Sequence, residues 1–168
     1  MGEIIKHDFL DVGGLGQHLG RLTPEEKTIR LAAFYRILAG KPASIDELAL
    51  ETGIAASLVS QCVGAMADRG ILVTNEHRTV TGSHGLSLIP TDHRLTINGR
   101  NIFTWCAADA VGIPAALGMD AVISSRCFLC NTPIQITMSG GEVHYSNQAD
   151  TRVWVIEADL GRSIVGCA

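Results

Sequence analysis

The helical part of this 168-residue chain opens with residues 23–53, TPEEKTIRLAAFYRILAGKPASIDELALETG. Thr23 is followed by a proline and then by Glu26 three positions on, which is the pattern of a capping box with proline in the first helical turn. Ser44 and Glu47 repeat the capping box before the next apolar run. The stretch therefore predicts two helices, over residues 24–38 and 46–52.

A third helix and a β-hairpin are expected to follow. Residues 56–69 carry apolar side chains at helical spacing before a glycine. Two short runs rich in β-branched residues come next, over residues 71–74 and 79–81. Three helices with a tight turn before the third, followed by a hairpin, are typical of a winged helix-turn-helix domain. We therefore expect a winged-helix-like domain over residues 23–82, preceded by a glycine-rich N-terminal arm over residues 1–22.

The charge of the chain argues against DNA binding by this domain. Thirteen Lys and Arg stand against 17 Asp and Glu, which gives a formal net charge of −4. The expected recognition helix holds one basic residue, Arg69, and Asp68 precedes it. Contacts to the DNA backbone and bases depend on such donors. We therefore expect no nucleic-acid partner, and a metal-responsive DNA-binding regulator is an alternative that the charge disfavours.

The second half of the chain changes to short apolar runs separated by Gly, Pro and Asn. Asn98-Gly99 between two such runs is a strong hairpin signal. A helix is expected after it, with Thr104 as its cap and Pro114 as its break. The chain is thus expected to be α+β, with a mixed or antiparallel sheet and a short helix that carries the site. The predicted strands cover residues 86–89, 94–97, 121–125, 134–138, 142–145 and 152–157.

The composition of the chain indicates the cellular compartment in which we expect the protein. Hydrophobic residues make up 46% of the chain and charged residues 18%, but no apolar run approaches the roughly 20 residues of a membrane span. The first residues lack the apolar stretch of a signal peptide. Five cysteines, an odd number, favour reduced thiols over a disulfide framework. We expect a cytoplasmic protein with no membrane partner, and the sequence leaves its oligomeric state open.

A thiol and a carboxylate are spaced for joint chemistry at the start of the expected helix. Cys106 falls at the second helical position, where free backbone N–H groups favour the thiolate and lower the thiol pKa. Asp109 lies three residues on, so the two side chains share one helical face and could exchange a proton. The alternative is a small core cysteine beside an aspartate that interacts with the helix dipole.

Two further thiols form a Cys-x-x-Cys motif, Cys127 and Cys130. A closed zinc site needs a second pair or histidines three to five residues apart, and the six histidines contain no such pair. The motif could therefore hold zinc only if Cys106 or Cys167 completed the set in space. A redox role lacks the strand-then-helix context of thioredoxin.

The second half also resembles a known family. Two signatures carry the resemblance, Trp105-Cys106-Ala107-Ala108-Asp109 and Ser124-Ser125-Arg126-Cys127, with supporting matches over residues 86–95, 97–100 and 114–118. These runs are similar to the core of the organomercurial (alkylmercury) lyases, and the resemblance extends in order over about residues 20–164.

The resemblance implies protonolysis of a carbon–mercury bond, which gives a hydrocarbon and thiolate-bound Hg(II). Mercury is a soft metal that prefers thiolate sulfur, so Cys106 would bind the metal of the organomercurial substrate. Asp109 would take the proton of a second thiol and pass it to the leaving carbon. Cys127 matches a family cysteine that is structural more than catalytic. No organic cofactor is implied. Cellular thiols would be co-reactants, and thiols or a mercuric reductase would receive the metal.

The chain departs from the family at its C-terminus, where the family carries a Cys-Cys-His segment with the second catalytic thiol and then continues. Val165 and Gly166 align without gaps to the two cysteines, and Cys167 follows them. We therefore expect residues 83–168 to be a C-terminally short lyase-like catalytic domain. Cys167 is the second catalytic thiol if the loop before it is slightly longer than in the family, and otherwise a one-cysteine site binds metal and turns over poorly. The alternative is a non-catalytic protein on the same scaffold that binds Hg(II), Cu(I) or zinc. The candidate metal ligands are Cys106, Cys127, Cys130 and Cys167.

Overall fold

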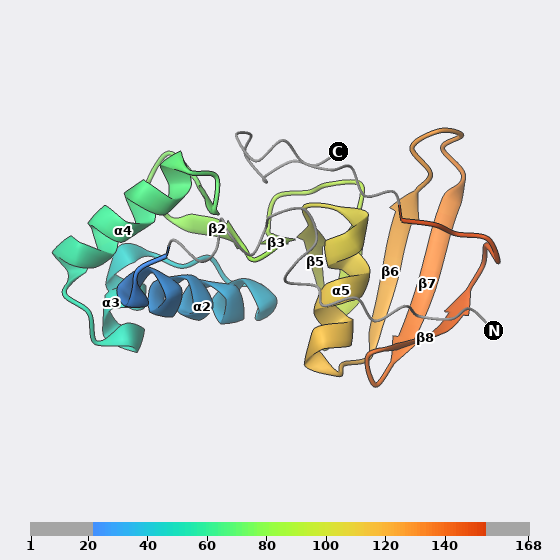
Figure 1. Ribbon diagram of the computed structural model, residues 1–168, viewed down its shortest axis with the longest axis horizontal. Coiled ribbons are helices and arrows are strands. Elements are labelled where there is room, and N and C mark those ends of the chain that lie inside the picture. Colours follow the sequence, from blue (N-terminus) through green and yellow to red (C-terminus); the bar gives the residue numbers. More distant parts are fainter. Residues whose placement is uncertain (1–21, 154–168) are drawn as a thin grey trace.

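Helices and antiparallel strands make up residues 22–153, the part of the chain that the computed structural model describes (Figure 1). The helices are α2 (Pro24–Leu38), α3 (Ile45–Thr52), α4 (Ala56–Asp68) and α5 (Ala107–Leu117). The strands are β1 (Leu72–Thr74), β2 (Val80–Ser83), β3 (Leu86–Ser87), β4 (Arg94–Ile97), β5 (Arg100–Thr104), β6 (Ala121–Arg126), β7 (Pro133–Ser139) and β8 (Glu142–Ser146). The expected α+β class is confirmed. The expected arm lies outside the described residues except for Leu22, as does most of the strand expected over residues 152–157.

Both capping boxes form as the sequence predicts. Thr23 Oγ1 accepts a hydrogen bond from the Glu26 amide at 3.2 Å, and Glu26 Oε2 accepts one from the Thr23 amide at 3.0 Å. Ser44 and Glu47 make the same reciprocal bonds at the start of α3. Gly53 ends α3 in the left-handed conformation, with φ 71°. These caps satisfy backbone N–H groups that would otherwise have no intrahelical partner.

Helix α2 contributes to both hydrophobic cores of the molecule. Ile29 and Ala33 pack with residues of α3, α4 and β1 in the first core. One turn on, Phe34 and Ile37 pack with the strands and α5 in the second core. Because one helix is buried in both, the helical half and the sheet half are held together by apolar contact.

A single sheet also runs through both halves. Its strand order is β1-β2-β3-β5-β4-β6-β7-β8, and every pairing is antiparallel. Three helices followed by the β1–β2 hairpin agree with the expected order of elements, while the winged-helix assignment stays a prediction. The expected domain boundary between residues 82 and 83 falls inside β2, and the division into domains also stays a prediction.

Helix α5 differs from the expectation at both ends. Its N-cap is Cys106 and not Thr104, because Thr104 is the last residue of β5 and its amide donates to the His93 carbonyl at 2.9 Å. Pro114 does not break the helix, which continues to Leu117 and ends at a left-handed Gly118. Proline already has a helical φ, and the burial of Pro114 offsets the hydrogen bond that its ring removes.

No single helix among the described residues is long and apolar enough to cross a membrane, and by length and composition only the bent pair of α3 and α4 passes such a test jointly.

The register of β4 predicts which of its side chains stabilise the fold. Leu95 is fully buried in the second core, and its neighbour Arg94 is exposed. Leu95→Ala should lower the free energy of unfolding by about 2–5 kcal/mol, because it removes buried methyl groups and leaves a cavity. Urea denaturation followed by circular dichroism measures this. Arg94→Ala is the matched control, and an equal loss in both variants would contradict the register.

Candidate active site

Cys106 is fixed where the sheet passes into α5. The preceding residue, Trp105, is buried, and its amide donates to the Gly85 carbonyl at 2.8 Å. Thr104 Oγ1 donates to the Cys106 carbonyl at 3.0 Å. Backbone and side-chain hydrogen bonds on both sides therefore hold the cysteine at the end of β5 and the start of α5.

Cys106 and Asp109 form a hydrogen-bonded pair. The Cys106 thiol donates to Asp109 Oδ2 at 3.2 Å, and the Asp109 amide donates back to Cys106 Sγ at 3.5 Å. The cysteine thus acts as the side-chain cap of α5 while its proton lies against a carboxylate. The spacing of three residues brings the two groups together as the sequence predicts.

The structure contradicts the expected acidity of the thiol. Burial, followed by the negative charge of Asp109, raises the pKa of Cys106 to about 12. Backbone N–H groups of Asp109 and Ala108 act in the opposite direction, as a helix N-terminus should, but they are outweighed. The resting Cys106 is therefore a neutral thiol and not a thiolate.

The pKa of Asp109 is raised as well. Burial raises its pKa above the ordinary value, although hydrogen bonds from Cys106 and the charge of His93 lower it in part. A buried carboxyl with a raised pKa holds a proton more firmly than one in water and can deliver it within the site. A soft metal can therefore replace the proton on Cys106 Sγ, and the Asp109 carboxyl can hold a proton close to that sulfur.

Gly85 confines the Asp109 side chain. Gly85 has φ 83°, and a Cβ atom placed on it would lie 2.4 Å from Asp109 Cγ and Oδ1. No side chain other than hydrogen fits there without displacing the carboxylate. The sequence analysis missed this contact. A His-Gly turn between two short strands is its sole local signal, and it does not indicate what the turn packs against.

His93 and Ser125 are two further polar residues near the pair. His93 Nδ1 lies 3.0 Å from Ser125 Oγ. Burial lowers the pKa of His93, and the carboxylates of Asp92 and Asp109 oppose that shift. The net decrease keeps the imidazole mainly neutral at pH 7. Ser125 belongs to the Ser-Ser-x-Cys signature, so this signature reaches the site through His93.

The other candidate ligands are not gathered around Cys106. Cys127 and Cys130 lie in the loop between β6 and β7, where Cys127 is partly buried and Cys130 is exposed. Within residues 22–153, no three His, Cys, Asp or Glu side chains lie together as a metal site. Cys167, the expected second thiol, lies outside the described residues.

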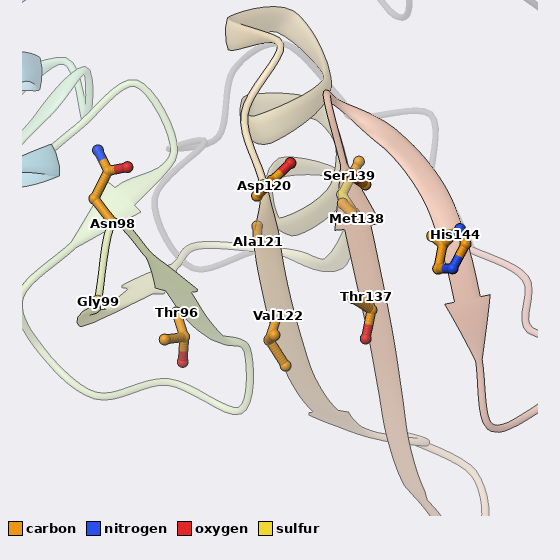
Figure 2. A pocket seen from close by; sticks show the side chains of 10 residues that line it. All are labelled: Thr96, Asn98, Gly99, Asp120, Ala121, Val122, Thr137, Met138, Ser139 and His144. Atoms are coloured by element: carbon orange, nitrogen blue, oxygen red, sulfur yellow. The ribbon is translucent and has the colours of Figure 1, made fainter.

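The strands also line an open groove of about 550 Å³ (Figure 2). Thr96, Val122 and Thr137 line it from three paired strands, with Asn98 and Gly99 at one end. These last two residues precede β5, whereas Cys106 follows it, so the groove and the thiol lie at opposite ends of that strand. No cysteine lines the groove.

Comparison with known proteins gives the site a context. Residues 86–167 match the sequence model of the alkylmercury lyase family. An alkylmercury lyase of Streptomyces lividans is 30% identical over 125 residues, covering 74% of this chain and 56% of that protein. An alkylmercury lyase of Pseudomonas putida is 29% identical over 146 residues, covering 84% of this chain and 65% of that protein. The chain therefore spans between about half and two thirds of these relatives.

A solved structure has the same fold. The mercury-bound form of MerB2 superposes with a TM-score of 0.84 at 29% sequence identity, over 90% of this chain and 73% of that one.

The effect of the Asp109 charge on the Cys106 pKa predicts how fast the Cys106 thiol is alkylated. At pH 8, Cys106 should react slowly with iodoacetamide, because little thiolate is present. Asp109→Asn should speed the reaction, since it removes the charge that helps raise the thiol pKa. Each pKa unit recovered raises the thiolate fraction about tenfold. Peptide mass spectrometry measures the labelling, with Cys130 as the internal control. Equal rates for Cys106 in both proteins would contradict the coupling.

Proposed function

We propose that this chain cleaves the carbon–mercury bond of organomercurials by protonolysis, since residues 86–167 match the sequence model of the alkylmercury lyase family. The products are a hydrocarbon and thiolate-bound Hg(II). The observation that carries the proposal is the hydrogen bond from the Cys106 thiol to the Asp109 carboxylate, which places a soft-metal ligand and a proton carrier 3.2 Å apart.

Cys106 binds the metal of the substrate. A neutral thiol reacts with an organomercurial R–Hg–X by giving its proton to the leaving X and its sulfur to mercury, so that Cys106 Sγ–Hg–R and HX form. Mercury binds thiolate sulfur in preference to oxygen or nitrogen ligands, and this preference overcomes the high pKa of the thiol.

Asp109 carries the proton that breaks the bond. It takes the proton of a second thiol, whose thiolate then binds mercury and weakens the carbon–mercury bond. The electron pair of that bond goes to carbon, which accepts the proton from Asp109 as the hydrocarbon leaves. Asp109 ends as a carboxylate, as it began. Its raised pKa favours the protonated form that this step requires.

We assign the second thiol to Cys167, the remaining cysteine of the matched residues near the end of the chain. The sequence supports this assignment, since Cys167 lies close to the family's second catalytic cysteine in the alignment.

The remaining expectations follow from the same proposal. Hg(II) is the bound product, thiols act as co-reactants, and no organic cofactor takes part. The transfer of mercury to thiols or to a mercuric reductase, and the cytoplasmic location, stay predictions.

Two substitutions separate the proposed roles. Cys106→Ala should abolish both mercury binding at the site and hydrocarbon release, because the metal ligand is lost. Asp109→Ala should keep mercury binding and lower hydrocarbon release by about 10²–10⁴-fold, the usual contribution of a positioned acid. Gas chromatography of the released hydrocarbon, with excess thiol present, measures turnover. An equal loss of binding in both variants would contradict the assigned roles.

The same assay tests the second thiol and the alternative function. Cys167→Ser should stop hydrocarbon release. A parent chain that retains mercury and releases no hydrocarbon would instead be a metal-binding relative of the lyases, and the proposal would be wrong.

Gly85→Ala tests the position of Asp109. The new Cβ should displace the carboxylate and reduce hydrocarbon release, while Cys106 still binds mercury. Gly53→Ala is the matched control, because Gly53 has φ 71° and a Cβ atom added to it would meet no other atom within 4 Å. Both changes carry a similar backbone strain, of about 1–2 kcal/mol. Equal activity in the two variants would show that Gly85 does not position Asp109.

A further inference from the structure

The loop between β6 and β7 presents two thiols outside the site described above. It is closed by two backbone hydrogen bonds, from the Cys127 amide to the Thr132 carbonyl at 2.9 Å and from the Asn131 amide to the Cys127 carbonyl at 2.8 Å. Asn131 has φ 58°, which completes the turn. The closed turn keeps Cys127 and Cys130 on one small loop.

The loop is open to solvent. Between the two cysteines, Phe128 is 100% exposed and Leu129 is 92% exposed. Cys130 is exposed and both thiols are free. Apolar side chains this exposed do not anchor the turn in a core, so small thiols and metal complexes can reach the sulfur atoms.

The surroundings of Cys130 differ from those of Cys106. Thr132 Oγ1 lies 3.1 Å from Cys130 Sγ. Hydrogen bonds from the Thr132 hydroxyl, the Thr132 amide and the Cys127 thiol lower the pKa of Cys130. This is the reverse of Cys106, whose pKa is raised by burial.

The pair suits a two-coordinate soft metal. Zinc requires four ligands, and the described residues place no third His, Cys, Asp or Glu beside the two thiols. Hg(II) is satisfied by two thiolates in a linear arrangement, and it is softer than zinc. We propose that Cys127 and Cys130 form a surface dithiol site for Hg(II), separate from Cys106.

The position of the loop suits mercury released at Cys106. Thr104 of β5, His93 just before β4 and Ser125 of β6 form a row, since the Thr104 amide donates to the His93 carbonyl and the His93 ring contacts Ser125. Cys106 follows Thr104 by two residues, and Cys127 follows Ser125 by two residues, just past the end of β6. With two strand spacings between β5 and β6, the two sites lie at the same end of the sheet, roughly 10 Å apart in the direction across the strands.

Uptake is a thiol exchange that needs no oxidant. A complex RS–Hg–SR reacts with the two protein thiols, two protein sulfur–mercury bonds replace the two original ones, and the two protons go to the departing thiolates. The second exchange is intramolecular, so one thiol of the pair meets mercury held by the other at a roughly millimolar effective concentration. The pair should therefore hold Hg(II) against a monothiol kept at micromolar concentration.

The experiment uses the full chain, HgCl₂ as the probe, a micromolar monothiol as competitor and native mass spectrometry as the readout. Cys106→Ser/Cys167→Ser removes the thiols of the proposed active site and should retain one Hg(II) per chain. Adding Cys130→Ser should abolish that retention, and this exposed position carries little risk to folding. Adding Cys62→Ala instead is the matched control, because Cys62 is a buried thiol of the first core and its loss should leave the mercury bound.

Two results would overturn the inference. One is a Cys106→Ser/Cys167→Ser protein that retains no Hg(II), and the other is retention that persists after Cys130→Ser is added. Hydrocarbon release is not read in this experiment, so its outcome is distinct from that of the proposed lyase activity.

Discussion

The candidate site is built around one partly buried hydrogen bond, from the Cys106 thiol to the Asp109 carboxylate. Burial raises the pKa of both groups, because it disfavours the charged form of each. In the proposed reaction a mercury–sulfur bond replaces the sulfur–hydrogen bond of Cys106, and the Asp109 carboxyl delivers a proton to the leaving carbon. The proposal thus couples mercury binding and proton delivery in one contact.

The fold keeps that contact in place from several directions. Helix α2 is buried in both cores, and the sheet continues from the helical half into the half that carries the site. The turn between β2 and β3 brings Gly85 against Asp109, and the carbonyl of Gly85 also holds the Trp105 amide. The β2–β3 turn therefore confines the Asp109 carboxylate from just outside the family match, which begins at residue 86.

The features predictable from the sequence are those that local chemistry determines. The capping boxes at Thr23 and Ser44 and the spacing of Cys106 and Asp109 depend on residues within one helical turn, and all three are found as expected. The sequence predicts a lowered pKa for Cys106, and this prediction is wrong because burial raises it. The effect of the helix N-terminus is local and can be predicted from the sequence, whereas burial depends on the whole fold. For the same reason the contact between Gly85 and Asp109 could not be predicted, since the two residues are distant in the chain and the His-Gly turn does not indicate its partner. The role of Cys167 stays a prediction.

The central claim is that a proton from the protein's thiols, carried by Asp109, ends on the carbon that mercury leaves. Thiol and carboxyl protons exchange with solvent, so the direct measurement is the isotopic composition of the hydrocarbon released from a simple organomercurial in D₂O with excess thiol. We expect a hydrocarbon with one deuterium, at the carbon that was bonded to mercury, and one Hg(II) per turnover. Mercury that stays bound to the protein with its organic group intact would contradict it.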